Sequence, residues 1–168
     1  STGQRAHHFN VTTVGELTVN LTALQAKYQT FARDALKVWT DVSGISFREV
    51  ASGGNISFDD NQNGQAYCNA SWNGSGITTS AFVNVGADWD DICGDNYTFQ
   101  TFLHEIGHAL GLGHTGNYNG SASLTQRTFL NDSWQVSVMS YFSQSQNPDV
   151  TGPQLYTATA MIGDIIAI

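Results

Sequence analysis

Apolar side chains recur every three or four residues in one stretch near the N-terminus. One face of the implied helix carries the apolar residues Leu24, Tyr28, Phe31, Ala35 and Val38. The opposite face carries the charged residues Lys27, Arg33, Asp34 and Lys37. This period is typical of an amphipathic helix that packs its apolar stripe on a core. Thr22 and Gln25 have the spacing of a capping box, so we predict a helix from about Thr22 to Trp39.

Four other stretches have the alternating or continuous apolar pattern of β-strands: residues 17–21, 45–50, 55–58 and 77–85. Residues 69–76 are polar and contain glycine, which favours a loop. A second helix is expected to begin at a cap formed by Asp95 or Asn96 and to end near Leu112. Residues 114–139 are rich in loop-forming residues, and a final helix is predicted from about Ala160 to Ile168.

Residues 104–114 contain a candidate metal-binding motif. They have the pattern HExxHxxGxxH, with the sequence His-Glu-Ile-Gly-His-Ala-Leu-Gly-Leu-Gly-His. His104 and His108 lie on one face of a helix, so both imidazoles can hold one ion. Gly111 allows the chain to leave the helix through a left-handed turn, which brings His114 round as a third ligand. Three imidazoles and an open position are typical of catalytic zinc. Glu105 can face the open position as a general base.

Two alternatives to this zinc site are weaker. A charged helix face could contain HExxH by chance, but the extended pattern uses three of the five histidines in the chain. A Ser-His-Asp triad would need a further histidine. His7 and His8 remain, and they lie in a segment with weak signals, where a solvated arm or the start of a strand is the simpler interpretation.

A second motif follows at residues 137–141, Ser-Val-Met-Ser-Tyr. With it the chain resembles the metzincin zinc endopeptidases, and within them the secreted bacterial serralysins. A methionine in a tight turn lies beneath the zinc site of metzincins, and the resemblance places it at Met139. Taken alone, this residue would be read as core filler. The resemblance further implies that Tyr141 is an additional zinc ligand, which leaves zinc on substrate binding and hydrogen-bonds the developing oxyanion.

The resemblance extends to residues 39–47, 114–119 and 164–168. Astacins, another metzincin branch, share Tyr141, but residues 117–119 and 164–168 favour serralysins. The implied fold is α+β, with a twisted mixed sheet and two long helices in the N-terminal half, and an irregular C-terminal half with the Met-turn and a final helix. Residues 1–168 would form one catalytic domain, with an upper part of about 1–112 and a lower part of about 113–168. The calcium-binding β-roll common in the family is not expected here.

The resemblance implies a secreted zinc-dependent endopeptidase acting on proteins and peptides. Substrate would pair with an edge strand near Ala81–Val85, although a fully paired sheet strand is the alternative interpretation of these residues. A proteinaceous inhibitor is a further candidate partner, and we expect a monomer. An inactive zinc-binding module on the same fold is the rival hypothesis, and the presence of Glu105 argues against it.

Composition and charge limit the kinds of partner that the chain can bind. The net charge of −8 argues against nucleic acid and against an anionic membrane surface. In a secreted protein, Cys68 and Cys93 are expected to form a disulfide, and two buried free thiols are the alternative. Four acidic residues crowd the segment before the zinc motif: Asp88, Asp90, Asp91 and Asp95. They could bind calcium, or they could form a solvated acidic run.

Overall fold

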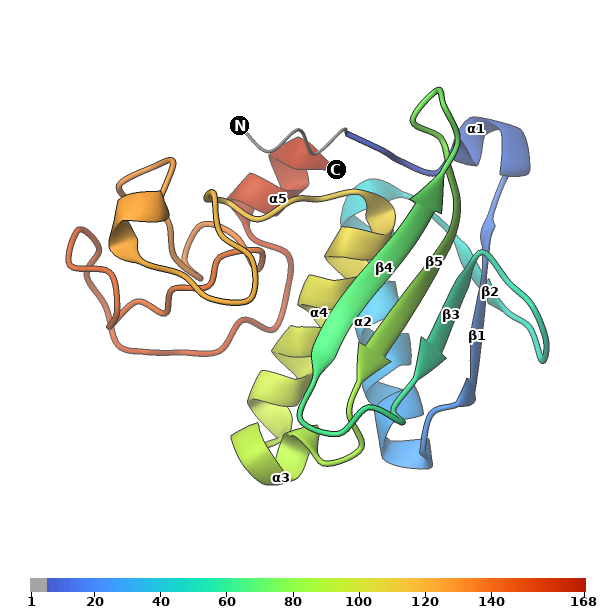
Figure 1. Ribbon diagram of the computed structural model, residues 1–168, viewed down its shortest axis with the longest axis horizontal. Coiled ribbons are helices and arrows are strands. Elements are labelled where there is room, and N and C mark those ends of the chain that lie inside the picture. Colours follow the sequence, from blue (N-terminus) through green and yellow to red (C-terminus); the bar gives the residue numbers. More distant parts are fainter. Residues whose placement is uncertain (1–5) are drawn as a thin grey trace.

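The computed structural model describes residues 6–168. Two long helices pack together against one face of a five-stranded sheet, and the C-terminal third forms loops on the far side of α4 (Figure 1). The helices are α1 (Val11–Val14), α2 (Ala26–Ser43), α3 (Trp89–Cys93), α4 (Asp95–Leu110) and α5 (Ile162–Ala167). The strands are β1 (Leu17–Ala23), β2 (Phe47–Glu49), β3 (Ile56–Asp59), β4 (Ala66–Trp72) and β5 (Thr78–Val85). This arrangement confirms the predicted α+β class with two long helices.

The strands lie in the order β2-β1-β3-β5-β4, and only the β4–β5 pair is antiparallel. Strand β5 is therefore interior: Ala81 pairs with Ile56 on one side and with Ala70 on the other. The prediction of an exposed edge at Ala81–Val85 is wrong, and the fully paired alternative is correct. The edge of the sheet beside α4 is β4.

Strand β4 was missed because its pattern is faint. Its inward residues Ala66, Cys68 and Ala70 pack against the core, but they are small. The residues between them are polar or amphipathic, as is usual on the outer face of an antiparallel edge. The predicted polar loop at residues 69–76 is therefore strand as far as Trp72.

Helix α2 begins at Ala26 rather than at Thr22. Thr22 lies in β1, where its hydroxyl donates to Asn20, so the predicted capping box does not form. Instead, the backbone N–H of Gln25 donates to the carboxylate of Asp60, 2.7 Å away. This cap comes from a residue distant in the sequence, so local spacing could not reveal it.

The buried face of α2 is also rotated slightly from the predicted stripe. It consists of Tyr28, Ala32, Ala35, Leu36 and Trp39. Trp39 accounts for the shift, because its indole N–H donates to the backbone oxygen of Leu103 at 3.1 Å and fixes α2 against α4. Phe31 and Val38 are only half-buried.

Residues 111–161 contain one short helical element, a 3₁₀ turn at Leu124–Gln126, before α5 closes the chain. The irregular C-terminal half and the final helix are therefore confirmed, with α5 shorter than predicted. Buried side-chain hydrogen bonds organise this half in place of a strand ladder. No helix in the described part of the chain has the length and apolar character needed to cross a bilayer.

Candidate metal centre

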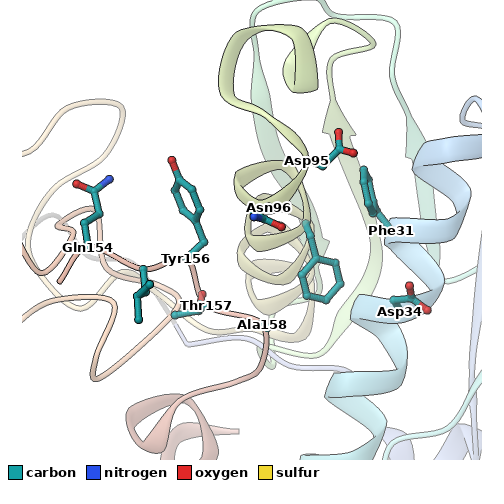
Figure 2. Close-up of a pocket in the computed structure, with 10 residues that line it drawn as sticks. Phe31, Asp34, Asp95, Asn96, Gln154, Tyr156, Thr157 and Ala158 are labelled. Atoms are coloured by element: carbon teal, nitrogen blue, oxygen red, sulfur yellow. The ribbon is translucent and has the colours of Figure 1, made fainter. Parts of the chain in front are cut away.

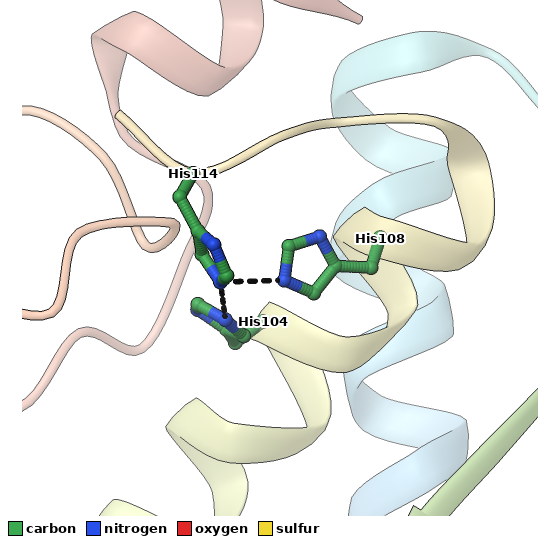
Figure 3. Close-up of side chains that lie close together, drawn as sticks. All are labelled: His104, His108 and His114. Carbon is green, nitrogen blue, oxygen red and sulfur yellow. Dashed lines mark hydrogen bonds between the residues drawn. The ribbon is translucent and has the colours of Figure 1, made fainter. Parts of the chain in front are cut away.

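The three histidines of the motif come together at the C-terminal end of α4. His104 and His108 lie one turn apart on the helix, which ends at Leu110. Gly111 has a left-handed φ of 112°, a conformation that a residue with a side chain rarely adopts. The turn returns the chain so that His114 faces the other two rings (Figure 3). Within the described residues, this is the one group of histidine, cysteine, aspartate and glutamate side chains close enough to hold a metal.

The outer nitrogen of each ring is fixed by a backbone carbonyl. Nδ1 of His104 lies 2.8 Å from the oxygen of Val138, Nδ1 of His108 lies 2.8 Å from that of Leu112, and Nδ1 of His114 lies 2.9 Å from that of Tyr118. A carbonyl oxygen can only accept, so Nδ1 carries the proton in each neutral ring. Burial lowers the pKa of all three histidines, that of His114 to about 4, so the rings are neutral at pH 7.

The inner nitrogens are consequently three lone pairs that face one another. Nε2 of His114 lies 3.3 Å from Nε2 of His104 and 2.9 Å from Nε2 of His108, the contacts dashed in Figure 3. Unprotonated nitrogens cannot hydrogen-bond with each other, so a cation is the partner that they fit. Tetrahedral nitrogen ligands of zinc are about 3.4 Å apart, which matches this spacing. Backbone carbonyls in this position commonly fix the orientation of metal-binding imidazoles.

Glu105 is 6% exposed, and its Oε2 has no hydrogen-bond partner. Burial raises its pKa to about 8. Glu105 lines a cleft of about 740 Å³ together with His108, His114 and Tyr141. Ala66, Cys68 and Ala70 of β4 line the same cleft, so it runs between the edge strand and the histidines. An unpaired buried carboxylate is costly unless its role is to meet a ligand or a proton.

The Met-turn lies where the resemblance placed it. Met139 is 2% exposed, and its sulfur is so close to Gly107 that a Cβ there would lie 2.7 Å away. The ring of Tyr141 packs edge-on to that of His114, with centroids 4.5 Å apart. Its hydroxyl accepts a long hydrogen bond of 3.4 Å from the backbone N–H of Gly120. Tyr141 is thus beside the histidines and lines the cleft.

Two buried carboxylates that the sequence analysis did not assign to the site support it from behind. Asp132 is 1% exposed and accepts hydrogen bonds from the hydroxyls of Thr115, Tyr118 and Ser140. It thereby joins the loop after His114 to the Met-turn. No periodicity marks this aspartate, and only its place a few residues before the Met motif could have drawn attention to it.

Asp164 of α5 has a similar role on the opposite side. It is 1% exposed and accepts from the hydroxyl of Ser137 and from the backbone N–H groups of Val138 and Met161. Val138 in turn supplies the carbonyl that faces His104. The C-terminal helix is therefore connected to the first histidine through the Met-turn.

The cysteine pair differs from the prediction. Cys68 and Cys93 are free thiols, which agrees with the alternative and not with the expected disulfide. Cys68 faces the cleft from β4, whereas Cys93 ends α3, just before α4 begins. Burial and then the nearby charge of Glu105 raise the pKa of Cys68 to about 12.

The acidic segment before α4 does not gather around a common point. Lys27 pairs with both Asp90 and Asp95, and Asp88 accepts from the backbone N–H of Gly64 at 2.8 Å. This arrangement favours the solvated acidic run over a calcium site. Asp95 also borders a second cavity, of about 510 Å³, between α2, α4 and residues 154–158 (Figure 2). None of the residues predicted for the zinc site lines that cavity.

Comparison with known proteins agrees with this geometry. Residues 7–166 match the M12B family of reprolysin-like metallopeptidases. The chain is 36% identical over 149 residues to metallopeptidase AprA of Pseudomonas marginalis and 35% identical over 154 residues to serralysin C of Dickeya chrysanthemi. These alignments cover 80% and 82% of this chain but 31% of each relative, so the chain spans about a third of their length.

Two solved structures share the fold. Myroilysin superposes with a TM-score of 0.54 at 21% identity, over 90% of this chain and 91% of that one. High choriolytic enzyme 1, a hatching enzyme zinc-protease from Oryzias latipes, superposes with a TM-score of 0.59 at 12% identity, over 95% and 91%. The chain belongs to the reprolysin-like metallopeptidase family, and its likeness to serralysins agrees with the resemblance found in the sequence.

Proposed function

We propose that this member of the metallopeptidase family is a secreted zinc-dependent endopeptidase that hydrolyses peptide bonds in proteins. One observation carries the proposal: three neutral imidazoles direct their lone pairs at one point, beside a buried and unpartnered glutamate in a cleft. His104, His108 and His114 would hold the ion. Bound zinc lowers the pKa of a water ligand and polarises a carbonyl.

Glu105 would act as the general base. Its carboxylate takes the proton of the attacking water and passes it to the leaving amine. Burial raises the pKa of this carboxyl group in the metal-free chain, and a raised pKa makes the carboxylate a stronger base. Its burial also keeps bulk water from competing for the same oxygen.

Tyr141 would be a further ligand in the resting site. When substrate enters, its hydroxyl would turn to the scissile carbonyl and donate a hydrogen bond to the oxygen as negative charge develops there. Its position supports this role, because the hydroxyl has only a long hydrogen bond to Gly120, which is easily exchanged.

Substrate would bind as an extended strand along β4. The sheet ends at this strand, and its inner face lines the cleft opposite the histidines. An edge strand offers unpaired backbone groups to a peptide. This replaces the binding strand that the sequence indicated at Ala81–Val85. We treat residues 1–168 as the catalytic domain of a monomer, with an upper part of about residues 1–112 and a lower part of about residues 113–168. A proteinaceous inhibitor is a further candidate partner.

The test is hydrolysis of an unstructured protein such as casein by the zinc-loaded chain. We expect activity that a chelator removes and zinc restores. Glu105→Gln should retain about one zinc per chain and lose about 10²- to 10⁴-fold in rate, because it removes proton transfer and no ligand. Hydrolysis by Glu105→Gln at the wild-type rate would refute the mechanism. A zinc-loaded wild-type chain that binds peptides without cleaving them would support the rival interpretation as an inactive binding module.

A further inference from the structure

The cleft has an aromatic wall at one end. His7 and Trp72 stack with ring centroids 4.5 Å apart and an angle of 5° between their planes. Both residues line the cleft that contains Glu105. Trp72 remains 45% exposed although His7 covers one of its faces, so a large part of the indole is available to a ligand.

This wall is built by contacts from distant parts of the chain. Backbone hydrogen bonds join His8 to Gly76 and to Thr78, and Nδ1 of His7 lies 3.0 Å from the hydroxyl of Thr78. These bonds hold the N-terminal segment beside the turn between β4 and β5 (Figure 1). The carbonyl of His7 also packs on Gly111, where any Cβ would collide with it. His7 is therefore fixed between the sheet and the end of the metal-binding helix.

Trp72 is the last residue of β4, and Cys68 and Ala70 of the same strand also line the cleft. Trp72 lies four positions after Cys68, which lines the cleft together with Glu105. At about 3.3 Å per residue, this separation is about 13 Å along the strand. An extended peptide paired with β4 would place a side chain against Trp72 about three or four residues from its scissile bond.

We propose that His7 and Trp72 form a substrate subsite for an aromatic side chain, three or four residues from the cleaved bond. This inference rests on the endopeptidase function proposed above. Stacked or edge-on aromatic contacts with an exposed indole favour an aromatic ring over an aliphatic side chain. A guanidinium could also stack on indole, but among the described residues that line the cleft Glu105 is the only acidic one, and it lies at the histidine end. An arginine at Trp72 would have no carboxylate to pair with, so an uncharged ring is the better fit.

The decisive experiment uses internally quenched peptides with one fixed scissile bond and Phe, Ala or Arg placed three or four residues to either side. At one of these positions the wild-type chain should cleave the Phe peptide about 3- to 10-fold faster in kcat/KM than the Ala peptide, as expected of one aromatic contact. Trp72→Ala should remove this preference and Trp72→Phe should retain it. Phe129→Ala, at an exposed aromatic residue outside the cleft, is the matched control and should keep the preference.

A binding measurement separates this proposal from the proposed function. The inactive Glu105→Gln chain should bind the Phe peptide about 3- to 10-fold more tightly than the Ala peptide by calorimetry, and adding Trp72→Ala should equalise the two. If wild type cleaves no peptide, the endopeptidase proposal fails, while the binding ratio still decides the subsite. A Phe preference that survives Trp72→Ala, an Arg preference equal to that for Phe, or no preference at these positions would overturn the subsite. If Trp72→Ala is unfolded by circular dichroism, Trp72→Leu replaces it, because leucine keeps apolar bulk without a ring.

Discussion

Asp132 should control the metal site without touching the metal. Its carboxylate accepts from three hydroxyls, those of Thr115, Tyr118 and Ser140. The backbone oxygen of Tyr118 faces Nδ1 of His114, and the Tyr118 hydroxyl accepts from the backbone N–H of Tyr141 at 3.3 Å. Replacing Asp132 with alanine would therefore loosen the third ligand and Tyr141 together.

The expected loss of stability follows from the three hydroxyl donors that Asp132→Ala would leave without an acceptor. A buried group left unsatisfied costs about 1–3 kcal/mol, and hydroxyls of Thr115 and Tyr118, 2.7 Å apart, can partly satisfy each other. Asp132→Ala should then lower the free energy of unfolding of the metal-free chain by about 2–4 kcal/mol. Zinc affinity should fall by about 10- to 100-fold, which is the usual effect of removing a group that orients a metal ligand. Asp132→Asn keeps one acceptor oxygen and should recover most of the affinity.

Urea unfolding measures the first quantity, and competition with a coloured chelator measures the second. Asp41→Ala is the control, because this carboxylate is 59% exposed and pairs with Lys37 on the surface. Its loss should change stability by less than about 1 kcal/mol and leave zinc affinity unchanged. If Asp132→Ala binds zinc as tightly as wild type while losing stability, the aspartate supports the fold alone and the positioning argument is wrong.

Three further predictions concern Glu105, Tyr141 and the cysteines. In the metal-free chain, burial raises the pKa of Glu105 from 4.5 to about 8, so the folded form binds this proton more tightly than the unfolded form. The resulting stabilisation is complete below pH 4.5 and is lost as the pH rises towards 8, by at most about 5 kcal/mol. Glu105→Gln should not lose stability in this way. If the free energy of unfolding changes equally with pH in the two proteins from about pH 5 to 8, the prediction is wrong. Tyr141→Phe should lower kcat and kcat/KM together, by up to about 100-fold with zinc retained, whereas a change in KM alone would make Tyr141 a substrate contact. Both cysteines should be alkylated after unfolding without reductant, with Cys68 the slower in the native chain because burial raises its pKa to about 12; mass spectrometry that finds a Cys68–Cys93 bridge would restore the disulfide hypothesis.

The convergence of the three histidines was predictable because their placement is local. The helical period alone puts His104 and His108 on one face, and the glycine at residue 111 ends the helix where a left-handed turn is required. The partners of these rings were not predictable in the same way. Their carbonyls belong to Val138, Leu112 and Tyr118, and two of these lie in loops whose course depends on Asp132 and Asp164. Only the resemblance through the Met motif indicated that residues 137–141 return to the helix.

The errors fall where structure depends on pairing between distant segments. The N-terminal cap of α2 is supplied by Asp60, the edge strand β4 has small or polar side chains, and the cysteines lie on separate elements. A polar edge strand is stabilised by backbone hydrogen bonds to its neighbour, which leave no signature in residue type. Because β4 was not recognised as a strand, β5 was wrongly predicted to be the edge of the sheet.

The cleft lies between helix α4 and strand β4, and we expect the two to have different roles: α4 in the reaction and β4 in the choice of substrate. The α4 wall supplies Glu105 and His108, which would set the class of reaction, and both belong to a short motif. The β4 wall supplies the strand edge and Trp72, which would set the substrate, and its sequence is weakly patterned. Within the described residues, the outer edge of β4 has no neighbouring strand, so its backbone would be open to a substrate. Under this proposal the chemistry depends on a short motif and the substrate on a weakly patterned strand, which is why the sequence indicates the reaction more readily than the substrate.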